Sequence, residues 1–173
     1  IVMATQNPIE YEGTYTLPES QLDRFLLRAE IGYPPAADEL RIMRRRDPLK
    51  DLAELQPVLT AASLLHMQDC VGQIHVDESV AQYMLAIVQA TRTHEQIQLG
   101  ASPRGALSFY EACQARAMVE GKDFVTPADV KYMAEPVLGH RILIKSRGAD
   151  LATAARERAR VITEILKTVK APD

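Results

Sequence analysis

The chain has 173 residues, of which 47% are hydrophobic and 25% are charged, and its formal net charge is -3 at pH 7. These values are ordinary for a globular protein, and they exclude the strongly basic composition that is typical of nucleic-acid-binding domains. Two cysteines do not make a disulfide framework, which favours a reducing, cytoplasmic setting, and no apolar run approaches the length needed to cross a bilayer.

Two short apolar segments at the beginning of the chain predict strands of a buried parallel sheet. Residues 1–4 are apolar and run into the polar residues 5–8, while residues 25–31 alternate in the manner of a strand. The residues between them are long enough for the crossover that parallel neighbours require. Because two strands do not form a stable sheet alone, we expect further strands upstream, in a longer parent protein.

Polar residues between these segments are the first candidates for a site. Asn7 follows the carboxyl end of a predicted strand, where open α/β sheets bind ligands, so it is either a turn residue or a ligand contact. Pro18 can open a short helix in which Leu22 and Phe25 pack inward. On its residue type alone, Arg24 is expected to form a surface salt bridge.

The chain beyond Tyr33 predicts a domain made of helices. The sequence Tyr33-Pro34-Pro35 is typical of a stiff linker. Apolar residues at helical spacing, together with capping residues, then predict helices over 36–46, 60–71, a segment that begins after Asp77, a segment from Pro103 to about Gly121, 127–138 and 151–169.

The helix expected from Pro103 begins in an unusual way. Ser102 is a favourable N-cap, and proline at the first helical position loses nothing. Arg104 then places a cation where the helix dipole is already positive, whereas the helix from Pro127 has an acid, Asp129, in its first turn. Arg104 either belongs to a phosphate site formed with the free amides of this helix end, or it caps a carbonyl or pairs with a nearby acid.

A complete catalytic set is absent from the sequence. No P-loop, no strand ending in a paired Asp-Glu, no G-x-S-x-G and no H-E-x-x-H motif occurs. His66 and Cys70 are four residues apart and could share a helix face with His75 nearby, but a cysteine in the core and a histidine at its edge is the better interpretation. We therefore predict no metal site.

Three segments, in this order, closely resemble the MoxR branch of the AAA+ ATPases. They are residues 4–8 (ATQNP), residues 17–25 (LPESQLDRF) and residues 100–106 (GASPRGA). Residues 10–15 (EYEGTY) and 32–34 (GYP) match as well, so the likeness covers almost the whole chain. Each motif alone would be moderate evidence, whereas the ordered set is strong.

The resemblance implies roles for three residues. Asn7 corresponds to sensor 1, which helps to place the water that attacks the γ-phosphate. Arg24 corresponds to the arginine finger, which reaches the nucleotide of the neighbouring subunit, and Arg104 corresponds to sensor 2, which contacts the nucleotide of its own subunit. The implied cofactor is ATP or ADP with Mg²⁺, whose ligands are not in this chain.

The resemblance also implies a mainly α fold. Residues 1–33 would be the end of an α/β P-loop NTPase core, with its last strands, and residues 34–173 would be the helical AAA+ lid domain. The parent would be an ATP-driven, chaperone-like protein that forms a ring, expected to be a hexamer, and acts with partners such as von Willebrand A domain proteins. Because the Walker A and Walker B segments are absent, the chain alone is not expected to hydrolyse ATP.

Two other functions are compatible with the residues. The chain could be a non-enzymatic helical module that binds a partner through the amphipathic residues 151–169, which the missing P-loop favours. A related motor acting on nucleic acid is suggested only by the arginines at 44–46, which more often form a solvated face, so nucleic acid is not an expected partner.

Overall fold

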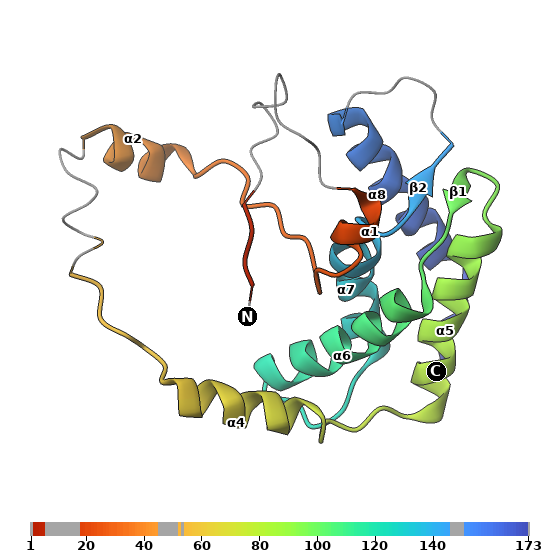
Figure 1. Ribbon diagram of the computed structural model, residues 1–173, viewed down its shortest axis with the longest axis horizontal. Helices are drawn as coiled ribbons and strands as arrows, with labels where there is room; N and C mark the ends of the chain where they lie inside the picture. The colour runs from red at the N-terminus through yellow and green to blue at the C-terminus, as the bar shows by residue number, and fades with distance from the viewer. Residues whose placement is uncertain (1, 6–17, 45–51, 53, 146–150, 173) are drawn as a thin grey trace. The chain divides into compact units, whose positions relative to one another are not determined.

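The computed structural model describes residues 2–5, 18–44, 52, 54–145 and 151–172. It contains two compact units, one made of Ile1–Arg28 with Cys70–Asp173 and the other of Ala29–Asp69. The described residues are mostly helical and include one small sheet, which confirms the predicted fold class (Figure 1). The helices and strands are α1 (Glu19–Leu22), α2 (Ala36–Arg44), α4 (Ala61–Val71), α5 (Glu78–Thr93), β1 (Ile97–Leu99), α6 (Pro103–Val119), α7 (Pro127–Leu138), β2 (Leu143–Ile144) and α8 (Leu151–Thr168).

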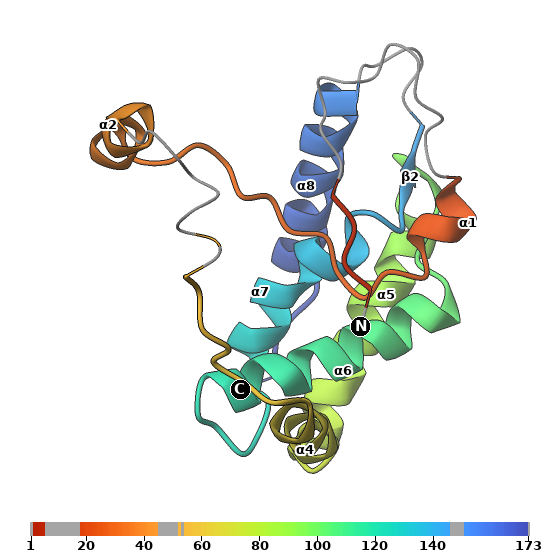
Figure 2. The same cartoon turned by 60° about the vertical axis from the view of Figure 1, so that its left-hand side comes forward.

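Four helices of the larger unit enclose its hydrophobic core. Helix α6 packs against α5 and α7, and α8 packs against α5 and α7, as the two views show (Figures 1 and 2). Each helix contributes fully buried side chains, among them Ile87, Phe109, Val130 and Ile162. Burying an aliphatic or aromatic side chain stabilises the fold by about 1.5–3 kcal/mol. This core holds α6 in place, and one of the predicted site residues, Arg104, lies in the first turn of that helix.

The predicted helix starts are confirmed in their details. The Asp77 carboxylate accepts from the amide of Ser79, and the Ser102 hydroxyl accepts from the amide of Gly105 at 3.1 Å. Each bond satisfies an amide that has no partner within the helix. At the other end of α6, Gly121 has φ 72°, a left-handed conformation that glycine adopts without strain.

The strands predicted near the beginning of the chain are wrong for the described residues. Residues 2–5 and 25–31 form no strand, and Val2, Met3 and Ile31 are exposed. A strand needs a neighbouring strand for its backbone groups, and no described strand lies beside either segment. The sheet instead consists of β1 and β2, antiparallel, with Ile97 opposite Ile144. It lies at one end of α5 (Figure 1).

The smaller unit, Ala29–Asp69, contains α2 and most of α4. The predicted helices over 36–46 and 60–71 are confirmed as α2 and α4, although residues 45 and 46 lie outside the described range. Thr60 caps α4, because its hydroxyl accepts from the amide of Ser63 at 3.0 Å. Neither α2 nor α4 contains a buried residue.

A buried acid at the start of α7 makes stability depend on pH. Burial of Asp129 opposes its ionisation, but hydrogen bonds from Lys122 at 2.7 Å and from Thr126 hold the pKa of its carboxyl below the ordinary 3.8. A lowered folded-state pKa adds stability at higher pH, and this contribution is lost as the pH falls through and below 3.8. We expect the free energy of unfolding of Asp129→Asn to vary less than that of the parent in acid, as measured by urea unfolding between neutral and acidic pH.

Candidate functional site

The first turn of α6 presents Arg104 to solvent. Its side chain is exposed, and within the described ranges it makes no hydrogen bond and no ion pair. The first turn of α6 contains no acid, and the dipole adds partial positive charge at this end. The guanidinium is therefore a cation that the described chain leaves available for an anion. The alternative, in which Arg104 caps a carbonyl or pairs with an acid, is not observed among these residues.

An acid of the chain nevertheless contacts this helix end through Ser102. The Ser102 hydroxyl, which caps α6, donates to the Asp23 carboxylate, with both oxygens at 3.2 Å. The same hydroxyl accepts from Gly105, so its donor and acceptor capacities are both used. The sequence of this helix end suggested a negatively charged ligand. Asp23 thus provides part of that negative charge from within the chain. It also connects the turn after α1 to the start of α6.

The carboxyl end of α7 holds the same turn through Arg141. This side chain is fully buried, and its Nε lies 3.3 Å from the Asp23 carboxylate. Its guanidinium donates to the carbonyls of Asp23, Phe25 and Leu26 and also to Val137, in the last turn of α7. The last carbonyls of a helix have no internal partner and carry partial negative charge, which explains why a cation is stable there.

Two further contacts fix the turn to the end of α7. The backbone amide of Arg28 donates to the carbonyl of Pro136 at 2.9 Å, and the His140 ring lies 3.1 Å from the Phe25 carbonyl through Nε2. Burial, followed by the positive charge of Arg141, lowers the pKa of His140 below its ordinary value. Because a carbonyl oxygen can only accept, the Nε2–H group of His140 is the donor in this contact.

The predicted site residues have different outcomes. Asn7 lies outside the described residues. Arg24 lies in the turn after α1, where its side chain is exposed and has no partner within the described ranges. The segments of Arg24 and Arg104 meet through the Asp23–Ser102 contact. Burial lowers the pKa of Arg141, and the negative charge of Asp23 opposes this shift. The positive charge of Arg104 adds a smaller lowering, so the two arginines interact electrostatically.

Sequence reasoning missed Asp23, His140 and Arg141. No motif or spacing singles out Asp23, and nothing in the pattern of residues 139–142 predicts a buried arginine. Gly105 carries the one usable signal. A Cβ atom built on Gly105 would lie 2.9 Å from Cδ of Arg141, so a glycine in the first turn of α6 leaves space for a side chain from elsewhere.

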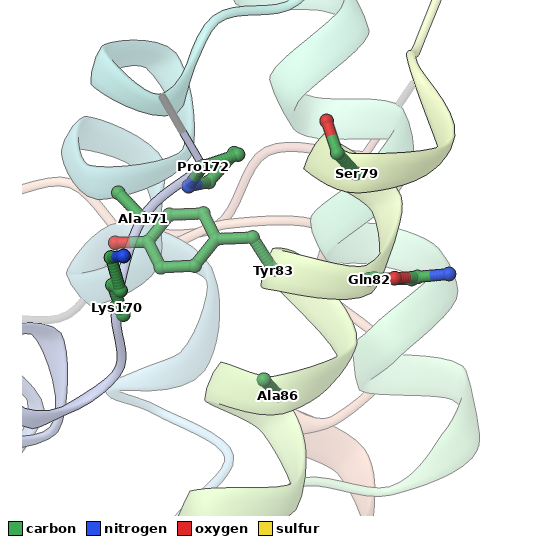
Figure 3. A pocket seen from close by; sticks show the side chains of 7 residues that line it. All are labelled: Ser79, Gln82, Tyr83, Ala86, Lys170, Ala171 and Pro172. Atoms are coloured by element: carbon green, nitrogen blue, oxygen red, sulfur yellow. The ribbon is translucent and has the colours of Figure 1, made fainter.

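Two pockets in the described structure lie away from these arginines. One, of about 350 Å³, lies between α5 and the C-terminal segment, where the buried Tyr83 ring contacts the region of Lys170 and Ala171 (Figure 3). The other, of about 430 Å³, is an apolar groove between α5 and α6, lined by Ala81, Met84, Leu85, Val88, Ala106, Leu107 and Tyr110. Neither pocket is lined by a predicted site residue, and the side chains of Arg24 and Arg104 are exposed.

No group of three or more histidine, cysteine, aspartate or glutamate side chains is placed to hold a metal ion among the residues that the structure describes. No described helix is both long and apolar enough to cross a membrane.

Comparison with protein families gives two matches. Residues 89–165 match the AAA lid domain, and residues 1–27 match the ATPase family associated with various cellular activities (AAA). The chain is 39% identical over 171 residues to YeaC of Bacillus subtilis, covering 99% of this chain and 52% of that protein. It is 36% identical to Chaperone MoxR1 of Mycobacterium tuberculosis, covering 99% of this chain and 47% of the relative.

A solved structure agrees with these matches. A putative ATPase from Cytophaga hutchinsonii superposes with a TM-score of 0.81 at 30% identity, over 97% of this chain and 53% of that one. The chain thus spans about half the length of the relatives it matches. The matched lid segment includes α6, α7 and most of α8, and the matched AAA segment ends within the turn that Arg141 holds. The chain belongs to the MoxR family of AAA ATPases, of which it contains the lid domain and the end of the AAA core.

Proposed function

We propose that this chain is the C-terminal part of an ATP-driven, ring-forming protein that assembles or activates other proteins. In this proposal the chain supplies three residues to the nucleotide sites. Arg24 is the arginine finger, Arg104 is the sensor 2 arginine and Asn7 is sensor 1. Arg24 reaches the nucleotide of the neighbouring subunit, whereas Arg104 and Asn7 act on the nucleotide of their own subunit. The name of the relative Chaperone MoxR1 supports the chaperone class.

The observation that carries the proposal is the availability of Arg104 at the start of α6. Its guanidinium is exposed and lacks a protein partner among the described residues, at a helix end that favours anions. These features fit a phosphate group of ATP or ADP. The donors described here do not form a magnesium site, so Mg²⁺ would be held by the remainder of the full-length protein.

The chemistry that this chain supplies is electrostatic. Phosphoryl transfer spreads negative charge over the γ-phosphate oxygens and the leaving oxygen, and a guanidinium placed beside them stabilises that charge. Arg104 neutralises bound phosphate, while Arg24 lowers the barrier at the site of the next subunit. The nucleotide-binding loop and the attacking water belong to the rest of the protein, so the chain alone binds nucleotide weakly and does not turn it over.

Replacing Arg104 with alanine tests this assignment. In the full-length protein we expect ADP to bind about tenfold to a hundredfold more weakly, because a charge-assisted hydrogen bond is lost. We also expect no loss of folding stability, since a cation in the first turn opposes the helix dipole. Calorimetric titration and urea unfolding measure the two quantities on the same samples.

Arg156→Ala is the matched control, because Arg156 is an exposed arginine on α8. This variant should bind ADP as the parent does. Unchanged ADP affinity in Arg104→Ala, with an intact fold, would contradict the role of Arg104 and leave the non-enzymatic interaction module as the better account.

A further inference from the structure

We propose that Arg141 is a positioning residue that fixes the Arg24 turn to the ends of α6 and α7, so that Arg24 and Arg104 move as one body. The proposal rests on the proposed function for its consequence in turnover, but its structural part stands on the contacts alone. Nothing in the sequence pattern identifies Arg141 as a residue that supports the proposed site.

The turn is held by two helix ends of opposite polarity. The positive end of α6 holds the Asp23 carboxylate through Ser102, and the negative end of α7 holds the guanidinium of Arg141. The pair between Asp23 and Arg141 closes the connection, with Nε 3.3 Å from Oδ1. Each charge is thus compensated both by its partner and by a helix end, which offsets the cost of burying the guanidinium of Arg141.

The shape of arginine is essential to this arrangement. One planar guanidinium donates to three backbone carbonyls of the turn, those of Asp23, Phe25 and Leu26, and to one carbonyl of α7. A lysine at the same position would offer one ammonium group on a flexible stem, and it could not satisfy these acceptors together. Gly105 completes the fit, because a Cβ atom there would meet Cδ of Arg141 at 2.9 Å.

The consequence concerns communication between neighbouring sites. Arg104 lies in the first turn of α6, and the cap of this helix, Ser102, is bonded to Asp23, which precedes Arg24 in the chain. A shift of α6 in response to phosphate at Arg104 would therefore carry the backbone of Arg24 with it. Arg141 makes that movement rigid, since it holds the backbone of the turn on both sides of Arg24. The state of one nucleotide would in this way adjust the finger that serves the next.

The structural part is tested by hydrogen exchange on this chain. In Arg141→Lys we expect the hydrogen-bonded amides of this segment, those of Arg24, Phe25 and Arg28, to exchange about tenfold faster or more. The reason is that the turn opens more often when the bonds from the guanidinium to its carbonyls are lost. The amide of Arg28, which is bonded to the Pro136 carbonyl, is the most direct reporter. Amides of α5 and α8 should keep their protection.

Arg116→Lys is the matched control. Arg116 is a partly buried arginine of the same unit, paired with Asp129 at 3.5 Å and stacked on Tyr132, and no described contact joins it to residues 24–28. It should leave exchange of those residues unchanged. Gly105→Ala is a second variant that keeps the arginine and displaces its side chain, so a folding failure of Arg141→Lys does not end the test.

Turnover in the full-length protein completes the experiment. We expect Arg141→Lys to lower kcat up to about a hundredfold while ADP affinity stays within a factor of about two, since a displaced catalytic group weakens the transition state only. Unchanged exchange of residues 24–28 in both variants would overturn the proposal, as would equal loss of protection throughout α5–α8. The proposal would also be overturned if Arg141→Lys showed faster exchange but full turnover while Arg24→Ala was inactive. If Arg24→Ala is also fully active, the proposed function of Arg24 has failed, and the structural link stands on the exchange data.

Discussion

Replacing Arg24 with alanine in the full-length protein will lower ATP hydrolysis about a thousandfold or more, with ADP binding largely retained. The reason is that a finger arginine contacts charge that develops only in the transition state, so its loss reduces kcat and barely changes ground-state binding. Arg24 is exposed and has no protein partner in the described part of the chain, so removing it costs the fold little. Steady-state hydrolysis and ADP titration measure the two effects.

Arg24→Lys and Arg156→Ala are the companion variants. Lysine keeps the charge but not the planar fork that can contact two phosphate oxygens at once, so we expect it to restore only part of the activity. Arg156 is an exposed arginine on α8, and its replacement should leave turnover as it is in the parent. Full activity of Arg24→Ala would remove the arginine-finger assignment.

The second large effect concerns stability and arises at Phe109. This side chain is fully buried on α6, the helix that positions Arg104. Phe109→Ala removes a ring from a closely packed core and is expected to lower the free energy of unfolding by about 3–5 kcal/mol. Urea or thermal unfolding of this chain measures the loss.

Leu107 on the same helix is the matched control for Phe109. Its side chain is 59% exposed, so Leu107→Ala should change the free energy of unfolding by no more than about 0.5 kcal/mol. Equal effects of the two substitutions would show that α6 does not pack as described.

The helices could be predicted because their signals are local. Asp77, Ser102 and Thr126 each precede a helix and cap it with their own side chains, and Gly121 provides the left-handed residue after α6. Caps and apolar spacing act over a few residues, so they can be identified without knowledge of the fold. The start of α7 at Pro127 and its end at Leu138 were both predicted correctly.

The strands failed for the opposite reason. An apolar run such as residues 1–4 suits a strand, but a strand forms only where a neighbouring strand supplies hydrogen bonds. The sequence of the run does not identify that neighbouring strand. Conversely, β1 and β2 are only three and two residues long and carry no periodic signal of their own. They pair because α5 and the segment after α7 bring them together.

Prediction of the site was limited in a similar way. Arg104 could be singled out because its charge is unfavourable at a helix start, which is a local conflict that suggests a ligand. Arg141 could not, since its contacts with residues 23–26 span more than a hundred positions of sequence. A buried arginine has no spacing rule, and its acceptors here are backbone carbonyls that every sequence possesses.

The most direct test of the account is a mixture of two variants that are each impaired at one arginine. Full-length Arg24→Ala and Arg104→Ala are expressed together with different tags, and assemblies that contain both are purified and assayed for ATP hydrolysis. If Arg24 serves the neighbouring nucleotide and Arg104 its own, some sites in the mixed assembly hold both arginines, and hydrolysis exceeds that of either variant alone. Hydrolysis no faster than the mean of the two separate variants would contradict the account, because it would mean that both arginines act on the same subunit or that neither contributes.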